Sequence, residues 1–301
     1  MAHRIPQVKG VRHSFIPVGD LNFHVAEAGE GEPVVLLHGW PQHWYSWRLV
    51  MPLLAEHHRV IAVDLRGFGW TDIAWQGFEK ENMADDVAKL LEALELERAA
   101  IVGHDWGGWI GYLLAMRHPE LVTRLVALSI PPPFVRIRPR TLLAVPRLRY
   151  QLALASPLAI RLLGRPKYVV RKLKRWSTTQ SNLPVDTRRL YGRDLRASTR
   201  ARATMMLYRT FLLRELGPVL AGRYRKQRLR VPTLILHGNR DPILPPVLFE
   251  EHDEHADDLR VEPVEGAGHL LPEERPELVA AKILGFLGEG TPERQAAAES
   301  V

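Results

Sequence analysis

Residues 99–108 read Ala-Ala-Ile-Val-Gly-His-Asp-Trp-Gly-Gly, so that an apolar run enters a glycine-flanked turn at Asp105. A helical pattern follows over residues 107–118. The spacing of Gly103, Asp105 and Gly107 matches the nucleophile elbow G-x-S-x-G, with an aspartate in the position of the serine. The competing interpretation is an aspartate that only caps the helix, and the side chains at the other strand ends argue against it.

Apolar runs of strand length precede and follow this turn. After a β-hairpin whose turn is Gly19-Asp20, they cover residues 33–37, 59–65, 99–103, 125–130 and 233–237. Runs this rich in valine, isoleucine and leucine are typical of parallel strands that are buried on both faces. Helical patterns alternate with the runs, for example over residues 79–94 and 278–287. We therefore predict a doubly wound α/β fold with a mostly parallel central sheet and helices on both faces.

The pattern changes over residues 131–229, where no convincing strand occurs and leucines and arginines recur at helical spacings. We interpret this segment as a helical cap that is inserted after the sixth strand and lies over the sheet. The core then consists of residues 1–130 and 230–290. The last residues, 291–301, are rich in alanine, glutamate and arginine and are expected to be disordered.

The charge of the chain is unevenly distributed. The 301 residues carry a formal net charge of +7, but residues 134–230 hold 25 lysines and arginines against three acidic residues, a net charge of +22. Such asymmetry indicates either an anionic partner or a solvated, arginine-rich surface. No recognised nucleic-acid motif accompanies it, so nucleic acid is not an expected partner. The basic and apolar stretch over residues 142–176 favours either weak association with an anionic membrane or a lipophilic substrate tunnel.

The composition excludes several classes of protein. The chain has no cysteine, so disulfides and thiolate metal sites are impossible. No apolar stretch approaches the roughly 18 residues that a membrane span requires, and residues 1–6 lack the apolar core of a signal peptide. The 13 histidines form no convincing metal set. We therefore expect a cytoplasmic protein that uses no metal ion and no organic cofactor.

Two further strand ends carry the partners that a nucleophile at Asp105 needs. Asp241 follows the run over residues 233–237, and His269 follows a predicted strand over residues 259–264. Ligands of open α/β sheets bind at the carboxyl ends of the strands. The order nucleophile, acid, histidine along the chain is the one that belongs with such an elbow. We predict that Asp105, Asp241 and His269 form a catalytic triad.

A carboxylate nucleophile determines the class of reaction. Attack by Asp105 on a saturated carbon forms an alkyl ester on the protein, which water then hydrolyses with His269 as the general base. The usual histidine pKa of about 6.5 leaves His269 neutral near pH 7. Substrates for this chemistry carry an electrophilic saturated carbon, such as an epoxide or an alkyl halide. The backbone N–H groups of Trp40 and Trp106 are the expected donors to the oxyanion that forms, by analogy with this type of elbow.

Several motifs resemble those of the soluble epoxide hydrolases of the α/β-hydrolase superfamily, over nearly the whole chain. These motifs are His38-Gly39-Trp40-Pro41, Trp44-Tyr45-Ser46-Trp47-Arg48, Asp64-Leu65-Arg66-Gly67-Phe68-Gly69 and the segments around Asp105, Asp241 and His269. The resemblance implies hydrolysis of an epoxide to a vicinal diol and a cis peptide bond between Trp40 and Pro41. We expect His38, Pro41 and Trp109 to line the pocket for a small lipophilic epoxide. A homodimer is compatible with the resemblance.

The resemblance also implies two cap tyrosines that donate hydrogen bonds to the epoxide oxygen. Tyr150-Gln151 matches the context of the first, and Tyr208-Arg209 matches that of the second. Two phenols suit this step, since ring opening leaves an alkoxide that needs a proton. Either tyrosine could instead be a packing residue of an amphipathic helix. Three other cap tyrosines compete with them, namely Tyr168, Tyr191 and Tyr224.

Haloalkane dehalogenases carry a similar His-Asp-Trp-Gly run, so dehalogenation remains an alternative. Trp106 would then be one halide donor, but Trp40 stands where the second donor, often an asparagine, is found. Fluoroacetate-type dehalogenases need arginines near the nucleophile, and Trp106 and Trp109 stand in their place. A non-catalytic binding protein with this fold is a second alternative, and the complete set of Asp105, Asp241 and His269 argues against it.

Overall fold

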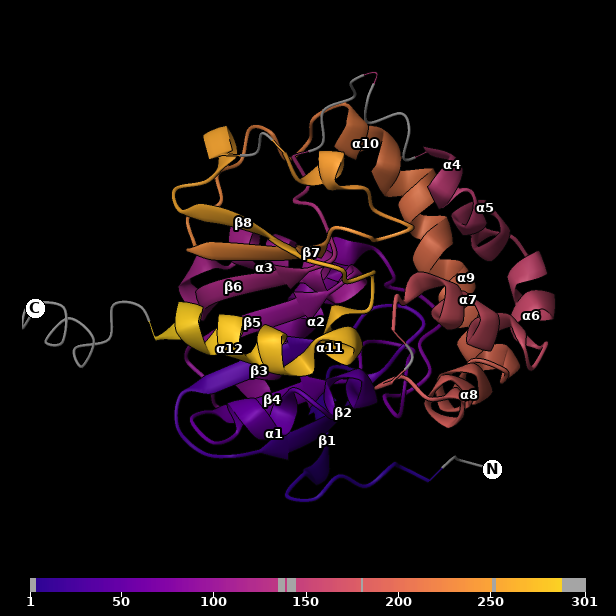
Figure 1. Cartoon of the computed structure of the whole chain (residues 1–301), viewed down its shortest axis with the longest axis horizontal. Helices are drawn as coiled ribbons and strands as arrows, with labels where there is room; N and C mark the ends of the chain where they lie inside the picture. The colour runs from indigo at the N-terminus through magenta and orange to yellow at the C-terminus, as the bar shows by residue number, and fades with distance from the viewer. Residues whose placement is uncertain (1–3, 135–138, 140–144, 180, 251–252, 289–301) are drawn as a thin grey trace, which may run out of the picture.

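A computed structural model of the chain describes residues 4–134, 139, 145–179, 181–250 and 253–288. Its centre is an eight-stranded sheet with the strand order β1-β2-β4-β3-β5-β6-β7-β8 (Figure 1). β1 pairs antiparallel with β2, β2 pairs antiparallel with β4, and all other neighbours are parallel. The strands are β1 Arg12–Val18, β2 Leu21–Ala28, β3 Pro33–Leu37, β4 Arg59–Val63, β5 Ala99–His104, β6 Val122–Leu128, β7 Thr233–Gly238 and β8 Leu259–Val264. The predicted hairpin and mostly parallel sheet are confirmed.

Both faces of the sheet are buried, which explains why its parallel strands read as continuous apolar runs. Successive side chains of a strand point to opposite faces, so Val35 and Ile101 join the apolar core on one face, and Val34 and Val102 join the core on the other. α2 and α3 contribute to the first core, and α1 and α12 contribute to the second. The helices outside the cap are η1 Trp44–Trp47, α1 Met51–Leu54, α2 Lys80–Ala93, α3 Trp106–Arg117, η2 Pro119–Leu121, η5 Pro246–Phe249, η6 Asp253–His255, α11 Leu271–Glu274 and α12 Pro276–Leu287.

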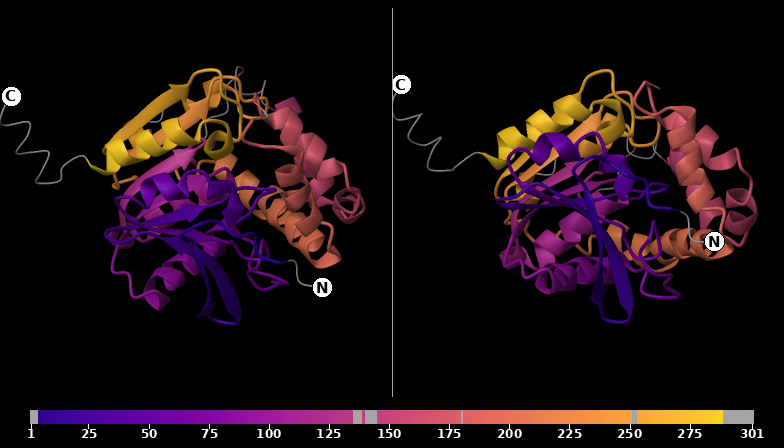
Figure 2. Two further views of the ribbon diagram at one scale, coloured as in Figure 1. Left: turned by 60° about the horizontal axis from the view of Figure 1, so that its bottom comes forward. Right: turned by 90° about the horizontal axis from the view of Figure 1, so that it is seen from below.

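The cap helices lie between β6 and β7 in the chain and gather on one side of the sheet (Figures 1 and 2). They are α4 Val145–Leu148, α5 Tyr150–Ala155, α6 Leu158–Leu163, α7 Tyr168–Trp176, α8 Val185–Asp194, α9 Ser198–Thr210, the π-helical turn η4 Phe211–Glu215 and α10 Leu216–Leu220. α5 and α6 both pack against α9, and α7 packs against α8. These helices agree with the predicted insert after the sixth strand. The predicted disordered tail, residues 291–301, lies outside the described residues.

The carboxyl ends of the parallel strands meet where the cap touches the core. The loops after β3, β5, β7 and β8 carry Trp40, Asp105, Asp241 and His269, in that order. The backbone N–H of His269 donates to the carbonyl of Trp176 in the cap at 2.9 Å. The indole N–H of Trp40 donates to the hydroxyl of Thr204, also in the cap, at 3.1 Å. The topology therefore brings four distant segments together under the cap.

Candidate active site

Asp105 lies in a strained turn between β5 and α3. Its backbone has φ 51° and ψ −121°, in a region of positive φ that residues other than glycine rarely adopt. A side chain at Gly103 would overlap the carbonyl of Gly107, and a side chain at Gly107 would overlap the carbonyl of Leu37. Only glycine fits these two positions, and the turn presents the Asp105 carboxylate at the end of the sheet.

The structure brings Asp105, His269 and Asp241 together. Nδ1–H of His269 donates to Oδ2 of Asp241 at 2.7 Å, and Nε2 of the same ring lies 3.4 Å from Oδ2 of Asp105. Oδ1 of Asp241 accepts from the backbone N–H groups of Ile243 and Leu244, at 2.7 and 3.0 Å. Asp241 thus orients the ring of His269, and the second ring nitrogen faces the carboxylate of Asp105, as a general base requires.

The two carboxylates hold His269 as a cation. Burial alone would lower the pKa of His269, but the charges of Asp241 and Asp105 outweigh burial and raise it to about 10. Burial alone would raise the pKa of Asp105, whereas the hydrogen bond and charge of His269 bring it below its usual value. In the free protein both carboxylates therefore favour the protonated form of His269, and loss of the Asp105 charge would remove one of the two charges that favour it.

The predicted oxyanion donors both bind the Asp105 carboxylate. The backbone N–H of Trp40 donates to Oδ1 at 3.1 Å, and the backbone of Trp106 donates to the same carboxylate. The peptide bond between Trp40 and Pro41 is cis, as the resemblance implies. A side chain at Gly39 would overlap Asp105, so this loop can come so close only with glycine there. Oδ1 thus lies beside a backbone donor, where an oxyanion could be stabilised, and Oδ2 faces His269.

Tyr150 and Tyr208 lie together in the cap, but they differ in their access to Asp105. The Trp106 side chain donates to the hydroxyl of Tyr208, and Tyr208 donates in turn to Tyr150. Tyr150 lines the cavity that contains Asp105, whereas Tyr208 is buried and is not among the described residues that line it. Burial and the charge of Asp105 raise the pKa of both phenols, so both stay protonated at neutral pH. Tyr150 is therefore placed for direct donation, and Tyr208 supports it.

The three competing tyrosines lie elsewhere. The hydroxyl of Tyr191 donates to Glu273 at 2.6 Å, and that of Tyr224 donates to Glu81 at 2.8 Å. The ring of Tyr168 packs against the ammonium group of Lys172. None of the three is among the described residues that line the cavity of Asp105.

A cavity of about 490 Å³ contains Asp105 and lies between the core and the cap. Its walls are mostly apolar and include Trp106, Trp109, Phe211 and Leu244. The structure therefore places Trp109 in the pocket, where the prediction put it. Within the described part of the chain, no group of three or more His, Cys, Asp and Glu side chains is arranged to hold a metal ion.

His38 and Pro41 do not line this cavity, contrary to the prediction. His38 is buried, and the backbone occupies both of its ring nitrogens. Nδ1–H donates to the carbonyl of Gly39, and Nε2 accepts from the N–H of Leu65, each at 3.0 Å. Pro41 is buried in the same loop. His38 therefore supports the loop that carries Trp40 and does not contact the substrate space.

Two buried residues near the site were not predicted. Glu274 accepts hydrogen bonds from the backbone N–H groups of Gly268 and Leu270, both at 3.0 Å, and so fixes the loop that carries His269. Lys80 packs against the ring of Trp106. A lysine at the start of an amphipathic helix normally reaches water, so the sequence pattern contained no signal for Lys80 in the interior.

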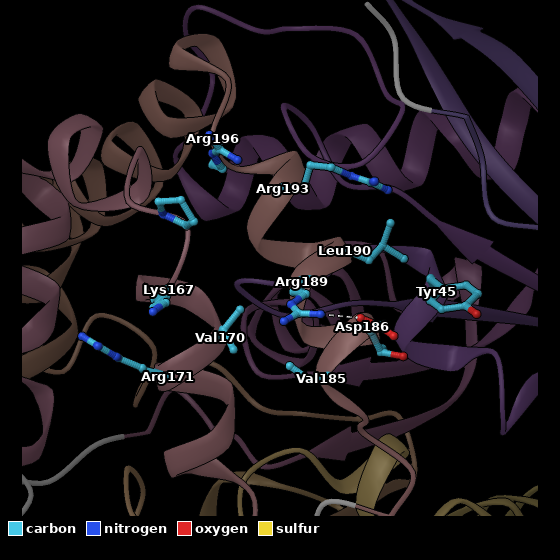
Figure 3. Close-up of a pocket in the computed structure, with 12 residues that line it drawn as sticks. Tyr45, Lys167, Val170, Arg171, Val185, Asp186, Arg189, Leu190, Arg193 and Arg196 are labelled. Carbon is cyan, nitrogen blue, oxygen red and sulfur yellow. Dashed lines mark hydrogen bonds and ion pairs between the residues drawn. The ribbon is translucent and has the colours of Figure 1, made fainter.

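A second hollow, of about 950 Å³, lies between α7 and α8 on the cap (Figure 3). Val170 and Leu190 contribute apolar surface to it, and Lys167, Arg171 and Arg193 contribute positive charge. It shares no lining residue with the cavity of Asp105. None of the helices in the described ranges is long and apolar enough to cross a membrane.

A sequence profile of the alpha/beta hydrolase fold matches residues 32–276. Over 126 residues the chain is 42% identical to the soluble epoxide hydrolase of Corynebacterium sp. (strain C12), covering 42% of this chain and 44% of that protein. Over 132 residues it is 36% identical to the fluoroacetate dehalogenase of Burkholderia sp., covering 42% of this chain and 43% of that protein. The fold matches the solved structure of the epoxide hydrolase CorEH with a TM-score of 0.78 and 29% identity, over 92% of this chain and 98% of that one.

The matched segments span less than half the length of these two curated relatives. The match to CorEH, in contrast, extends over both the core and the cap. Together the comparisons confirm the resemblance to the soluble epoxide hydrolases that the motifs indicated.

Proposed function

Because the chain belongs to the alpha/beta hydrolase fold family, we propose that it is an epoxide hydrolase that forms a vicinal diol through an ester on Asp105. The observation that carries this proposal is the carboxylate at the elbow, which shares an apolar cavity with the phenol of Tyr150. A carboxylate can attack an epoxide carbon, and a phenol can protonate the oxygen that leaves.

In the first step, Oδ2 of Asp105 attacks an epoxide carbon. A new carbon–oxygen bond forms on Oδ2, and the strained carbon–oxygen bond of the ring breaks. The leaving oxygen takes the proton of Tyr150, and the hydrogen bond from Tyr208 stabilises the phenolate that results. The product is a hydroxyalkyl ester of Asp105.

Formation of the ester prepares His269 for the second step. The charge and the hydrogen bond of Asp105 both raise the pKa of His269, so the neutral ester lowers it again. His269 then releases a proton and the phenolate of Tyr150 takes one up, so that the phenol is restored and His269 is neutral. Neutral His269 can deprotonate a water molecule, which attacks Cγ of the ester. Negative charge forms on Oδ1 beside the Trp40 and Trp106 N–H groups. Collapse of this intermediate breaks the bond between Cγ and Oδ2, and His269 gives its proton to Oδ2, which leaves as a hydroxyl of the diol. The proton of the new carboxyl group then passes to His269, so that ionised Asp105 and protonated His269 are restored.

The hydrogen bonds of two indoles argue against the dehalogenase alternative. A halide ion needs N–H donors that point into the cavity. The indole N–H of Trp106 donates to Tyr208, and the indole N–H of Trp40 donates to Thr204 at 3.1 Å. Neither indole is therefore free to hold a halide in this structure. The cavity wall beside Asp105 has tryptophans, Trp106 and Trp109, where a fluoroacetate-binding site would need arginines.

Two measurements test the proposal. The purified protein should convert members of a panel of lipophilic epoxides to diols, whereas release of halide from haloalkanes without any diol formation would refute epoxide hydrolysis. In a single turnover with excess protein in H₂¹⁸O, the diol should contain no label, because its new oxygen comes from Asp105. The label should appear in the peptide that contains Asp105. Labelled diol in the first turnover would instead indicate direct attack by water.

We further propose that the cap associates weakly with anionic membranes, from which lipophilic epoxides reach the cavity. Leu152, Leu158 and Ile160 on α5 and α6 are 67%, 45% and 40% exposed. Leu152 also lines the cavity of Asp105. Exposed apolar side chains among basic residues are typical of helices that lie on anionic membranes, and the hollow in Figure 3 adds further cations to the cap.

A further inference from the structure

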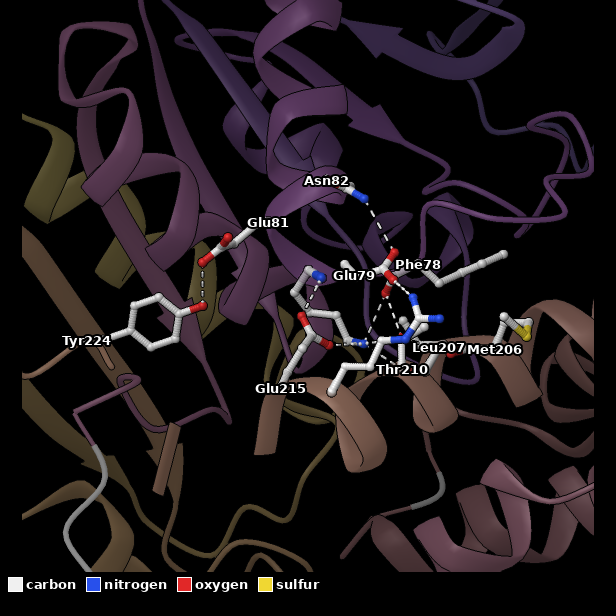
Figure 4. Close-up of polar contacts among 11 residues, drawn as sticks. Phe78, Glu79, Glu81, Asn82, Met206, Leu207, Thr210, Glu215 and Tyr224 are labelled. Atoms are coloured by element: carbon white, nitrogen blue, oxygen red, sulfur yellow. Dashed lines mark hydrogen bonds and ion pairs between the residues drawn. The ribbon is translucent and has the colours of Figure 1, made fainter. Parts of the chain in front are cut away.

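Lys80 is a fully buried cation at the boundary between the core and the cap. It is the first residue of α2, and its ammonium group points at the end of α9. Nζ donates to the carbonyl of Leu207 at 2.6 Å, to the hydroxyl of Thr210 at 3.1 Å and to Oε2 of Glu215 at 2.9 Å (Figure 4). Burial of an unpaired ammonium group costs several kcal/mol, so this dense set of partners is needed to keep the charge in the interior.

Lys80 and Glu215 each bind the backbone of the segment that carries the other. The carbonyl of Leu207 lies one turn before the π-helical turn η4, and Lys80 supplies a donor for it. In return, Oε1 of Glu215 accepts from the backbone N–H of Lys80 at 2.7 Å, in the first turn of α2, where a negative charge is favourable. Arg214 of the cap also pairs with Glu79, the residue before α2. We call this set of contacts the Lys80–Glu215 cluster.

The Lys80–Glu215 cluster is in direct contact with the chain of hydrogen bonds that runs from Trp106 through Tyr208 to Tyr150. Nζ of Lys80 lies 5.0 Å from the centre of the Trp106 ring and 5.5 Å from that of Phe211, within the range of cation–π attraction. Trp106 donates to Tyr208, and Tyr208 directly follows Leu207, whose carbonyl Lys80 binds. Lys80 therefore contacts the donor of this hydrogen bond and the helical turn that carries its acceptor.

We propose that Lys80, held by Glu215, is a positioning residue for ring opening. Its ammonium group fixes the indole of Trp106 against the last turn of α9, so that Tyr208 can donate to Tyr150 while negative charge develops on Tyr150. This inference rests on the proposed epoxide hydrolase function. It assigns to Lys80 an effect on the formation of the Asp105 ester and none on the hydrolysis of that ester, which depends on His269.

A double-mutant cycle of Lys80→Met and Tyr208→Phe tests this assignment. Single-turnover kinetics with an epoxide that the wild-type protein hydrolyses would measure ester formation and ester hydrolysis separately. Lys80→Met should slow ester formation about 5-fold, by no more than Tyr208→Phe does, and change ester hydrolysis less than about 2-fold. In the Tyr208→Phe background, Lys80→Met should have an effect below about 2-fold, because residues that act through one another are not additive.

A pH profile gives a second readout. Burial lowers the pKa of Lys80 to about 8, although Glu215 and Glu79 oppose this shift. Ester formation by the wild-type protein should therefore weaken as the pH rises through this value and the ammonium group is lost. Lys80→Met should lack this alkaline decrease, and Lys80→Arg, which keeps the charge, should restore part of the rate. The matched control is Lys89→Met, a lysine on the exposed side of the same helix, which should behave like the wild type.

Several results would overturn the assignment. Equal slowing of ester formation and ester hydrolysis would show that Lys80 only joins the cap to the core. An undiminished effect in the Tyr208→Phe background would show that Lys80 does not act through Tyr208. If Lys80→Met fails to fold, as judged by circular dichroism, the same cycle is run with Lys80→Gln, which keeps a donor for the Leu207 carbonyl. A wild-type protein that forms no diol from any epoxide would refute the proposed function itself, before the cycle begins.

Discussion

Nε2 of His269 faces Oδ2 of Asp105 at 3.4 Å, and the other nitrogen of the same ring is bound to Asp241 at 2.7 Å. A histidine between two carboxylates is protonated in the free protein and cannot act as a base there. In the mechanism that we propose, esterification of Asp105 removes one of the two charges. The same contact would then keep His269 protonated before the first step and release it for the second.

Replacement of His269 should separate the two steps. His269→Gln removes the general base but leaves the Asp105 carboxylate and the backbone donors in place, so the ester should form and accumulate. Intact-protein mass spectrometry after mixing with an epoxide should show an adduct of the mass of the substrate. Asp105→Ala is the matched control and should show no adduct and no turnover. A folded His269→Gln protein that binds substrate without any adduct would contradict covalent catalysis.

Ester formation and ester hydrolysis should respond differently to pH. The His269 cation outweighs the effect of burial and keeps the pKa of Asp105 below its usual value, so Asp105 stays ionised and ester formation continues in mildly acidic solution. Hydrolysis needs neutral His269, whose pKa falls from about 10 once Asp105 is esterified. Hydrolysis should therefore slow as the pH decreases through the lowered pKa that His269 has in the ester.

Rapid quenching at a series of pH values measures the fraction of protein that carries the ester. This fraction should rise as the pH decreases from 8 to 5. A fraction that stays constant or falls over this interval would mean that the protonation state of His269 does not control the second step.

The sequence was sufficient to predict those elements that depend on residues close together in the chain. A strand buried on both faces needs an unbroken apolar run, and β3, β4, β5, β6 and β7 each contain one. The elbow needs glycine at Gly103 and Gly107, where any side chain would overlap the backbone. The residues of the predicted triad follow three strands, so the predicted parallel sheet was sufficient to bring them to one edge.

The residues whose positions were predicted wrongly, or were not predicted, owe those positions to contacts between distant segments of the chain. A histidine after a strand can face the substrate or the backbone, and only the loop around Leu65 decides this for His38. Tyr150 and Tyr208 each match one of the two expected cap contexts, and the packing of α5 on α9 determines which of them lines the cavity. The position of Lys80 depends on Glu215, a residue of the cap 135 positions later in the chain. No local pattern contains that information.

Replacement of the two tyrosines should slow ring opening unequally. Tyr150→Phe removes the phenol that lines the cavity and should slow ester formation by about 10-fold or more, equivalent to about 1.4 kcal/mol. Tyr208→Phe removes the hydrogen bond to Tyr150 and the acceptor of the Trp106 side chain but keeps the phenol that lines the cavity, so its effect should be smaller. The double variant should be nearly inactive.

Single-turnover kinetics of the three tyrosine variants can distinguish the steps. Ester hydrolysis should change little, since it depends on His269 and the backbone donors. Tyr191→Phe is the matched control, because its hydroxyl is bound to Glu273 away from the cavity. A double variant that forms its ester at the wild-type rate would exclude both phenols as acids and would favour a substrate whose leaving group needs no proton, such as a halide.

Association of the cap with membranes should depend on its basic residues. Residues 134–230 carry a net charge of +22, and each lysine or arginine close to an anionic membrane contributes about 1 kcal/mol to binding. Lys167 and Arg171 line the hollow between α7 and α8. Replacement of both by glutamine should therefore weaken binding to vesicles that contain phosphatidylserine by roughly 10-fold or more. The change should leave turnover of a water-soluble epoxide unaltered, because neither residue lines the cavity of Asp105.

Co-sedimentation with phosphatidylserine vesicles and with purely zwitterionic vesicles, each at low and at physiological salt, measures this binding. The matched control replaces Lys89 and Arg98, two exposed cations of the core, by glutamine, so that both variants lose the same charge. If net charge alone attracted the protein, the two variants would lose binding equally. We expect the cap variant to lose more, because apolar side chains at Leu152 and Leu158 bring the cap, and not the core, into contact with the bilayer.

Salt should weaken the electrostatic part of this binding, since charges beyond about 8 Å are screened at physiological ionic strength. Absence of binding to phosphatidylserine vesicles even at low salt would leave the cationic cap as a solvated surface.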